Sequence, residues 1–439
     1  MGNSIYTRFT LARAGFAVLL LGTLAACGGT ETPLPGERLS IRGADVTAVA
    51  NRSAAISLPR AVSNADWSAL NGAADHSIGH VAFDPAASLR WSADVGRGVG
   101  RDYRITSGPV AADGRVFVLD GAGRVSAVSP EGAVLWTLDT TPAGEKPADG
   151  SGGGLSLANG VLYAGTGFGE VIAVDPVSGG IHWRRQMQAP LLSAPVSDGR
   201  NVYFVTRDDV AYALGAKDGS LEWMQRGAAA LDGFGGGASP AIRSGQVVLP
   251  FSSGDVMMVR ANSGQPKWNA PLDGGRQASA INRIGDISGD PVIDGNRLYV
   301  ASIAGQTVRM NLQSGKRDWS LPVGAVGPVW PAGGSVFLVS DDARMMRVNA
   351  ANGQVIWAQQ MAQYTNPDKR KGLIRYYGPV LAGGLLWVAD REGGLRGYSP
   401  TDGSVAARLD VPGGAAAAPI VMAGVMYVQT LDGKLLAFQ

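Results

Sequence analysis

The sequence predicts an all-β protein folded as an eight-bladed β-propeller, with four antiparallel strands in each blade. A Gly followed four residues later by a Trp recurs along the chain, at intervals of about 45 residues. Short stretches of alternating apolar residues precede each copy, and Asp, Asn or Ser beside a Gly supplies turn chemistry between them. A repeat of this length with several short strands is typical of a propeller blade.

The recurring Trp marks the outer strand of each predicted blade. We interpret it as structural, because a large ring on an outer strand can pack against the next blade. The alternative is a ring of Trp side chains that binds a ligand. A seventh copy of the repeat has Ala407 where Trp is expected. The docking residues predicted in the repeats are Trp136, Trp183, Trp223, Trp268, Trp319 and Trp357.

The two ends of the repeat array predict how the ring closes. Residues 415–439 supply three strands and stop without a fourth strand or a Trp. Near the other end, residues 88–91 form an isolated strand that carries Trp91. We therefore expect this N-terminal strand to close the last blade, because a closed ring covers edges that would otherwise aggregate. Trp91 would then be a further docking residue.

Composition excludes several classes of protein. Gly accounts for 63 of the 439 residues but not for every third one, which excludes a collagen. The 38 basic and 36 acidic residues leave a net charge of +2, so charge gives no case for a nucleic-acid partner. The single Cys excludes an intrachain disulfide and a thiolate-ligated metal site.

The N-terminus has the pattern of a processing signal. Arg8 and Arg13 precede a short apolar stretch over residues 16–24, whose last residue begins the tetrapeptide Leu-Ala-Ala-Cys that ends at Cys27. This tetrapeptide resembles the lipobox of bacterial lipoproteins, in which the Cys becomes the acylated first residue; the alternative is an incidental Cys. We expect a signal peptide over 1–26, a lipidated Cys27 with a flexible tether over 27–62, and the propeller over 63–439. No Asp follows Cys27, which favours the outer membrane.

A known family shares these features. The Gly-x-x-x-Trp repeat resembles the tryptophan-docking repeat of the quinoprotein (PQQ-like) propellers. Together with the lipobox and linker, residues 27–439 resemble the BamB family, the propeller lipoproteins of the bacterial outer-membrane β-barrel assembly (BAM) complex. The resemblance implies a protein that is not an enzyme, has no cofactor and faces the periplasm. Its implied partners are the POTRA domains of BamA, other BAM subunits and unfolded outer-membrane proteins.

The resemblance also implies two partner-binding segments. The first follows an Arg-Leu-Ser-Asp-Val-Asp pattern in the family. Arg283 and Asp286 match it, while Ser288 occupies its second acidic position. The second reads Leu-Ser-Leu-Arg-Gly in the family, and the Arg is absent here. Leu231 or Phe234 would supply its apolar contact.

Other groups of residues favour structural interpretations. His76 and His80 lie in a Gly-containing stretch that predicts a loop, so no metal site is expected, and Trp67 is expected on the rim of the propeller. Glycine-rich residues 150–154 lack the Lys and helix of a phosphate-binding loop, and they predict a tight turn. The basic run over 367–377 is expected to be a solvated loop, with contact to anionic lipid or an acidic partner as the alternative.

Two rival functions remain open. One is a PQQ-like propeller lipoprotein with another periplasmic scaffold role. The other is a PQQ-dependent dehydrogenase, but such enzymes carry paired Cys residues and calcium-ligating carboxylates, whereas this chain has one Cys. Neighbouring carboxylates such as Asp208 and Asp209 point to opposite faces of a strand, and no Ser has a His within motif range. No catalytic residue is therefore predicted.

Overall fold

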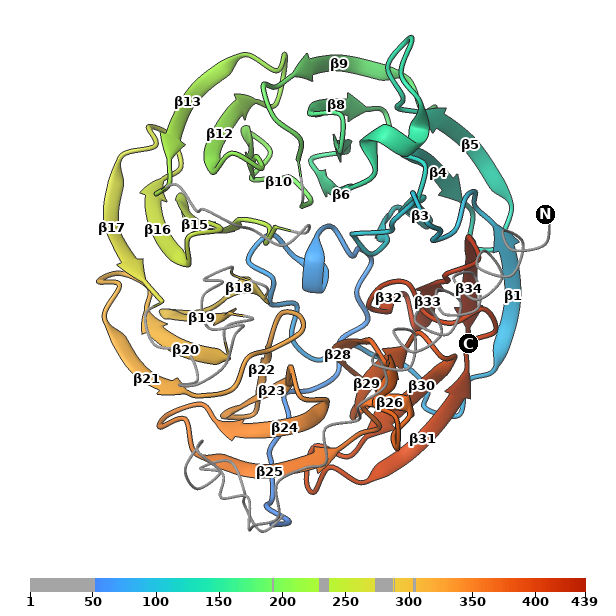
Figure 1. Ribbon diagram of the computed structural model, residues 1–439, viewed down its shortest axis with the longest axis vertical. Helices are drawn as coiled ribbons and strands as arrows, with labels where there is room; N and C mark the ends of the chain where they lie inside the picture. Colours follow the sequence, from blue (N-terminus) through green and yellow to red (C-terminus); the bar gives the residue numbers. More distant parts are fainter. Residues whose placement is uncertain (1–51, 192, 229–236, 273–286, 288, 303–304) are drawn as a thin grey trace, which may run out of the picture. The chain divides into compact units, whose positions relative to one another are not determined.

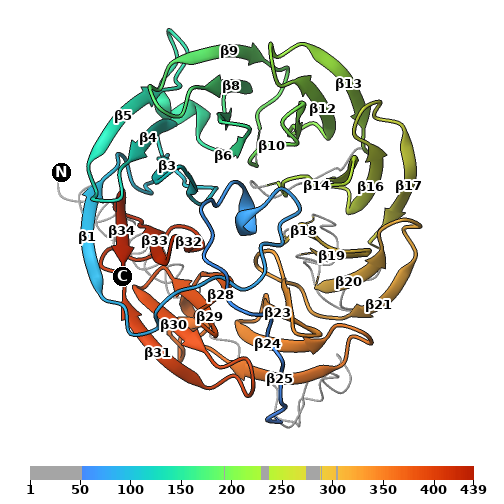
Figure 2. The ribbon, with the colours of Figure 1, turned by 180° about the vertical axis from the view of Figure 1, so that it is seen from behind.

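The alternating apolar strands and their Gly turns fold into eight four-stranded antiparallel sheets, which stand as blades around one axis (Figures 1 and 2). The structure is a computed structural model that describes residues 52–439, except for 192, 229–236, 273–286, 288 and 303–304. These residues belong to a unit that spans Asp45–Gln439. The predicted eight-bladed propeller is confirmed.

Blades 1 to 4 each run in chain order from the innermost to the outermost strand. Blade 1 contains β2 (Val110–Ala112), β3 (Arg115–Leu119), β4 (Arg124–Val128) and β5 (Val134–Asp139). Blade 2 contains β6 (Gly153–Ala158), β7 (Val161–Thr166), β8 (Glu170–Val174) and β9 (Ile181–Gln186). Blade 3 contains β10 (Val196–Ser197), β11 (Asn201–Val205), β12 (Val210–Gly215) and β13 (Leu221–Arg226). Blade 4 contains β14 (Ala241–Arg243), β15 (Gln246–Pro250), β16 (Asp255–Arg260) and β17 (Pro266–Pro271).

Blades 5 to 7 repeat this order, and blade 8 is composite. Blade 5 contains β18 (Gly289–Asp294), β19 (Arg297–Ser302), β20 (Gln306–Asn311) and β21 (Arg317–Leu321). Blade 6 contains β22 (Trp330–Ala332), β23 (Ser335–Val339), β24 (Arg344–Asn349) and β25 (Val355–Gln360). A hairpin of β26 (Tyr364–Asn366) and β27 (Lys371–Leu373) precedes blade 7, which contains β28 (Tyr376–Ala382), β29 (Leu385–Asp390), β30 (Gly394–Tyr398) and β31 (Val405–Asp410). Blade 8 contains β32 (Ile420–Met422), β33 (Val425–Gln429), β34 (Lys434–Phe438) and β1 (Leu89–Asp94). The described helices are two 3-10 turns, η1 (Leu70–Gly72) and η2 (Pro147–Gly150).

Burial follows the position of each strand within its blade. The second and third strands are covered on both faces by neighbouring blades, and all residues of β11 and β12 are buried. The outermost strands meet a neighbour on one face only, so β5 alternates between exposed and half-buried residues. The apolar core is therefore a set of layers between adjacent blades.

Each Trp of the repeat lies on the Gly turn of the following blade. Trp136 covers Gly179, where the backbone has a φ of +75° and an added Cβ would lie 2.8 Å from Cδ2 of the indole. The Nε1–H of Trp136 donates a hydrogen bond to the main-chain oxygen of Pro176 at 3.1 Å. The same Gly contact and main-chain hydrogen bond are made by Trp91, Trp183, Trp223, Trp268, Trp319 and Trp357.

The ring is closed by pairing its N-terminal strand with its C-terminal strand, as predicted. β1 runs antiparallel to β34, with Trp91 opposite Ala437 and Asp94 opposite Lys434. The main chains of Ser88 and Gln439 exchange two hydrogen bonds of 3.1 and 3.0 Å beyond these strands. We call this junction the seam.

The seam explains why the seventh repeat lacks its Trp. In blades 1 to 7 the docking Gly belongs to the turn between the third and fourth strands, but in blade 8 these strands are β34 and β1, and no turn joins them. Ala407 therefore faces a junction without a Gly turn. The volume that a Trp at position 407 would fill is occupied from within blade 7. Trp387 lies opposite Gly397 in the sheet, and Gly397 lies opposite Ala407. Phe83 packs against the edge of Trp387, with 5.5 Å between the ring centroids.

A segment that precedes β1 crosses one face of the ring. We call residues 52–83 the strap, and Figure 2 shows it on the near side, with η1 close to the axis. Its main chain and side chains hydrogen-bond to one innermost strand after another. These contacts join Asn64 to β32, Trp67 to β2, Ser68 to β6, Ala74 to β14, Asp75 to β18 and Val81 to β28.

The first described part of the strap is held by a buried arginine of blade 6. Arg347 on β24 is 4% exposed, and its guanidinium donates to the main-chain oxygens of Ala54 at 2.6 Å and Ala55 at 3.1 Å. It also donates to Pro400 of blade 7 and to the hydroxyl of Ser335. Residues 54 and 55, which lie within the predicted tether, thus contact the ring directly.

Candidate functional site

An axial cavity of about 560 Å³ opens where the inner ends of the blades meet. Its wall comes largely from the connectors that lead from one blade to the next and from the first residues of the innermost strands, including residues 104–110, 326–328 and 375–378. We call the face that carries these connectors the connector face. The strap contributes Trp67, Leu70 and Asn71 to the lining, and it therefore covers the inner end of the cavity.

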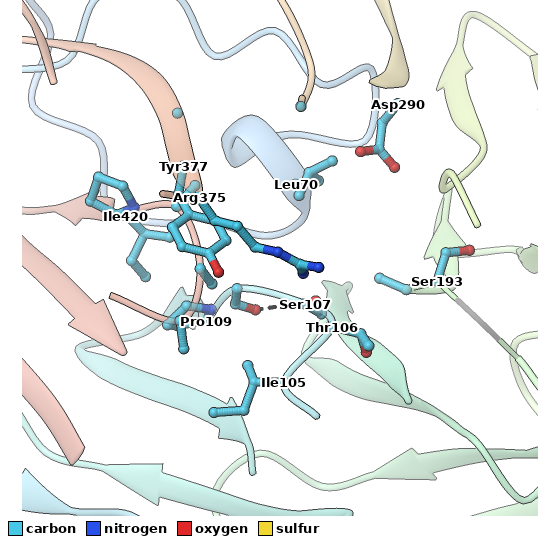
Figure 3. Close-up of a pocket in the computed structure, with 18 of the residues that line it drawn as sticks. Leu70, Ile105, Thr106, Ser107, Pro109, Ser193, Asp290, Arg375, Tyr377 and Ile420 are labelled. Carbon is cyan, nitrogen blue, oxygen red and sulfur yellow. Dashed lines mark hydrogen bonds between the residues drawn. The ribbon is translucent and has the colours of Figure 1, made fainter. Parts of the chain in front are cut away.

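The charged side chains around this cavity are mostly arginines. Arg101, Arg104, Arg375 and Arg391 line it, and Figure 3 shows the guanidinium of Arg375 extending into the space between Leu70 and Ser107. Arg101, Arg104 and Arg375 are exposed, and among the described residues the structure gives their guanidinium groups no carboxylate partner. Arg391 has Glu392 at 4.0 Å. The described lining of the cavity therefore carries more positive than negative charge.

Asp290 is the acidic residue that lines the cavity within the described part of the chain. Its carboxylate accepts a hydrogen bond from the main-chain N–H of Ser239. Burial raises the pKa of Asp290 to about 6, an effect that outweighs this hydrogen bond, which lowers it. Asp290 on β18 therefore ties the start of blade 5 to the connector that enters blade 4.

The residues predicted to bind partners lie outside the described residues. These residues are Leu231, Phe234, Arg283, Asp286 and Ser288, and the predicted lipidation site Cys27 likewise belongs to a segment that the structure does not describe. The described residues next to these segments do belong to the connector face. Gly237 and Ser239 follow the first segment, Asp290 follows the second, and all three line the axial cavity. The predicted roles of the undescribed residues stay predictions.

The strap accounts for the other aromatic and histidine residues noted in the sequence. Trp67 was expected on the rim, but it is 2% exposed at the centre of the ring, where its main chain pairs with Ala111 and its indole lies 6.3 Å from that of Trp330. The Nδ1–H of His76 donates to Pro291 and that of His80 donates to Pro59, both at 2.7 Å. In the described part of the chain, no three His, Cys, Asp or Glu residues form a metal-binding group.

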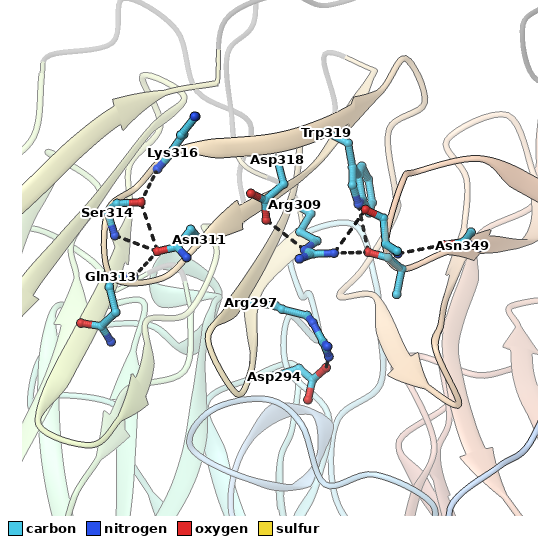
Figure 4. Close-up of polar contacts among 12 residues, drawn as sticks. Asp294, Arg297, Arg309, Asn311, Gln313, Ser314, Lys316, Asp318, Trp319 and Asn349 are labelled. Atoms are coloured by element: carbon cyan, nitrogen blue, oxygen red, sulfur yellow. Dashed lines mark hydrogen bonds and ion pairs between the residues drawn. The ribbon is translucent and has the colours of Figure 1, made fainter.

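A second set of polar contacts joins blades 5 and 6 and has no counterpart in the repeat motif. Arg309 on β20 pairs with Asp318 at 3.1 Å and also donates to the main-chain oxygen of Ala350 in the next blade (Figure 4). The Nε1–H of Trp319 donates to the same oxygen at 3.1 Å. Arg309 and Arg347 occupy equivalent positions in successive blades, opposite Trp319 and Trp357. The sequence did not predict the contacts of either Arg, because an Arg within a strand does not indicate which groups its guanidinium bonds.

The basic run forms the turn and the second strand of the β26–β27 hairpin and continues into the start of β28. Lys369, Arg370 and Lys371 are exposed, and Leu373 is 60% exposed. Arg375 extends from the end of this run into the axial cavity. Within the described residues, no helix is long and apolar enough to span a membrane.

The axial cavity does not fit the quinone and calcium pair of the enzymes with this fold. Its arginines would attract an anionic quinone, but calcium takes six to eight oxygen ligands, usually including carboxylates. The described lining offers the carboxylate of Asp290, which already accepts the Ser239 hydrogen bond. The only Cys of the chain is Cys27, so the paired Cys residues of such enzymes cannot form here.

Comparison with known proteins gives relatives along most of the chain. A family model described as "Outer membrane protein assembly factor BamB" matches residues 74–147, 121–359 and 363–439. The protein of that name from Yersinia pestis is 26% identical over 354 residues, which cover 79% of this chain and 88% of the relative. The one from Shewanella oneidensis is 29% identical over 361 residues, covering 79% of this chain and 87% of the relative.

Solved structures share the fold. BamB from Moraxella catarrhalis superposes with a TM-score of 0.67 at 19% identity, covering 81% of this chain and all of that one. Quinohemoprotein alcohol dehydrogenase from Comamonas testosteroni gives a TM-score of 0.64 at 14% identity, covering 86% of this chain and 81% of that one. At these identities both show the fold alone. The family model, in contrast, matches nearly the whole ring, and the chain belongs to the family of outer membrane protein assembly factors BamB.

Proposed function

We propose that this protein is a non-enzymatic scaffold lipoprotein of the outer-membrane β-barrel assembly complex. Membership of the BamB family carries this proposal. The architecture supports it, because a closed ring of eight blades holds its connectors on a rigid frame, and recognition commonly resides in loops on such frames. In this role the protein binds the POTRA domains of BamA, contacts other subunits of the complex and assists unfolded outer-membrane proteins.

The connector face is the surface that we assign to BamA. The two segments with family-like residues, one with Leu231 and Phe234 and the other with Arg283, Asp286 and Ser288, are both connectors between blades. The described residues that follow them, Ser239 and Asp290, are hydrogen-bonded to each other. This bond supports a single interface built from both connectors.

The anchor that we assign is a lipid on Cys27. The segment from Cys27 to the start of the strap contains 24 intervening residues and spans at most about 85 Å when fully extended. More than one acyl chain would hold the protein stably at the periplasmic side of the outer membrane, since a single chain binds only marginally. Metabolic labelling with a palmitate analogue, compared between the natural protein and Cys27→Ser, tests this assignment.

A capture experiment tests the proposed partner. The mature protein in detergent is incubated with the immobilised POTRA domains of BamA from the same bacterium. We expect micromolar or tighter capture, which Arg283→Ala/Asp286→Ala abolishes or weakens at least about tenfold. A matched control, Arg185→Ala/Glu222→Ala, removes one charge of each sign from exposed positions on β9 and β13 and should bind like the natural protein.

The possible results separate role from interface. Loss of binding only in Arg283→Ala/Asp286→Ala supports both the proposed role and the proposed interface. Equal binding by all three proteins retains the role and moves the interface, for which Leu231→Ser/Phe234→Ser is the next variant. No capture of the natural protein at micromolar concentration contradicts the proposed function.

A further inference from the structure

We propose that the axial cavity binds an extended acidic peptide segment, with one carboxylate of the peptide received by the arginines at the cavity mouth. This site opens on the connector face and adjoins the two segments assigned to BamA through Ser239 and Asp290. Its arginines belong to other parts of the chain, and the inference does not require the BamA assignment to be correct. The inference rests on the charge of the mouth, on the chemistry of the wall and on the closure of the inner end.

The charge of the mouth favours a carboxylate. Arg101, Arg104 and Arg375 bring three exposed guanidinium groups to one opening, and no described carboxylate neutralises them. The guanidinium fork matches a carboxylate with two parallel hydrogen bonds, so arginines are more selective for this group than lysines. Like charges gathered at one opening repel one another, and an anionic ligand relieves that repulsion.

The wall favours a peptide over other anions. Several residues of the wall have little or no side chain, so the main chain, with its N–H and C=O groups, forms part of the lining. These residues are Gly100, Gly108, Gly327, Gly378, Ala417 and Ala418. Ser193 also lines the cavity, and its hydroxyl is buried without a hydrogen-bond partner within the described residues. An extended peptide supplies amide groups that pair with such a wall.

The remaining lining accommodates the apolar parts of a peptide. Ile105, Ile420 and Tyr377 lie around the same space (Figure 3). The volume of about 560 Å³ falls within the range of ligand-binding sites, and the strap covers the inner end. A ligand therefore enters from the connector face and ends inside the ring.

Asp290 fixes which side of the cavity receives the carboxylate. Figure 3 shows Asp290 and Ser193 across the cavity from Tyr377, and Arg375 reaching between them and Ser107. A second negative charge beside Asp290 is unfavourable, so the peptide carboxylate lies toward Arg104 and Arg375. The side of Ser193 is then left to uncharged main-chain groups of the peptide.

The test uses fluorescent peptides and the mature protein in detergent. The first probe is Ala-Gly-Glu-Val-Asp-Gly-Ala with both ends blocked, and its neutral match carries Gln and Asn at the acidic positions. A third probe is the neutral peptide with a free C-terminal carboxylate, which distinguishes a chain end from a side chain as the source of the charge. Binding is followed by fluorescence anisotropy at 50 and 300 mM NaCl.

We expect the carboxylate-bearing probes to bind at least about tenfold more tightly than the neutral probe, with an affinity that falls as salt rises. Arg104→Gln/Arg375→Gln should remove this preference. A matched control, Arg185→Gln/Arg408→Gln, removes two exposed charges from the rim and should keep it. The melting temperature of each variant is measured alongside to confirm that the ring is intact.

Three results would overturn the inference. They are equal binding of the acidic and neutral probes to the natural protein, no saturable binding at millimolar probe, and an equal loss in the rim control. The POTRA capture experiment is read separately, because Arg104→Gln/Arg375→Gln should still be captured. Failure of capture together with selective binding of the acidic probe would reject the proposed function and retain the cavity site.

Discussion

The indole of Trp136 lies so close to Gly179 that a Cβ atom added to Gly179 would stand 2.8 Å from the ring. Real Cβ atoms are not found at such a distance from a neighbouring ring, so the site admits only glycine unless the indole moves. The hydrogen bond from Trp136 to Pro176 holds the indole in place. The pair therefore joins blade 1 to blade 2 through shape as well as through a polar contact.

Gly179→Ala should destabilise the ring more than a glycine substitution in an ordinary turn. The added methyl meets the indole and also suffers from the positive φ of +75°. We expect a loss of about 2–4 kcal/mol in the free energy of unfolding, measured by urea denaturation followed by Trp fluorescence.

Gly160→Ala provides the matched control for this prediction. Its φ is +72°, nearly that of Gly179, but no atom lies within 4 Å of the added Cβ. Gly160→Ala should lower the free energy of unfolding only by the backbone strain, about 1 kcal/mol. Equal losses in the two variants would show that the Trp contact does not decide the outcome.

Arg347→Ala should release the first part of the strap. The substitution removes the donors that hold the main-chain oxygens of Ala54 and Ala55. Proteolysis within residues 52–62 should accelerate at least about tenfold, with the cut sites identified by mass spectrometry. Arg309→Ala is the control, because Arg309 occupies the equivalent position but bonds Ala350 and Asp318 instead of the strap. Equal acceleration of proteolysis in both variants would contradict a specific role of Arg347 in holding the strap.

Asp290→Asn should make stability less dependent on pH between about 4 and 6. Burial raises the pKa of Asp290 from 3.8 to about 6, so the unfolded state loses its proton first as the pH rises through this window. The free energy of unfolding contributed by Asp290 therefore falls from pH 4 to pH 6. The Asn amide keeps an acceptor for the N–H of Ser239 and carries no charge. We therefore expect the free energy of unfolding of the variant at pH 7 to exceed that of the natural protein by about 1–3 kcal/mol. The same difference in melting temperature at pH 4.5 and pH 7 would contradict this account.

His76→Asn should reduce the stability that the protein loses on acidification, because His76, unlike Asp290, contributes more stability at high pH than at low pH. Burial lowers the pKa of His76 from 6.5 to about 4, so the unfolded state takes up a proton first as the pH falls from about 6.5 to 4. The stability that the neutral ring contributes is therefore present above pH 6.5 and is lost toward pH 4. Asn tolerates the φ of +60° at this position and cannot titrate. The variant should be less stable at pH 7 but lose less on acidification to pH 5, whereas His182→Asn on exposed β9 should follow the natural protein.

The blades could be predicted from the sequence because each one carries its own local signal. The Gly of each repeat needs a left-handed backbone and the Trp needs that Gly, so the motif marks the junction of two blades wherever it occurs. Closure was predictable because residues 415–439 lack an outer strand and residues 88–91 lack a sheet. The absence of Trp at position 407 was visible in the sequence, but its cause needed the structure.

The strap and the cavity could not be predicted, since neither has a local pattern. Residues 52–83 bond mainly through the backbone to strands that are far away in the sequence, which explains why Trp67 was placed on the rim instead of the axis. The arginines of the cavity come from distant parts of the chain, because Arg101 and Arg104 precede β2 whereas Arg375 directly precedes β28. They line one cavity only once the blades have assembled. A signal that could have identified them is the charge of connector residues compared across blades.

The seam has a consequence for the order in which the protein folds. Blade 8 needs residues 89–94 to pair with residues 434–438, so its sheet cannot be completed until almost the whole chain is available. Each of blades 1 to 7 consists of strands that are consecutive in the chain. These blades can therefore form one after another before β1 pairs with β34. A circular permutant that lacks residues 1–87, links Gln439 to Ser88 and opens the chain in another connector would join the two strands of the seam covalently, although it would also lack the strap. Folding of that molecule would shift its last step to the new opening, and blade 8 would then consist of consecutive strands, whereas in the natural chain no turn joins β34 to β1.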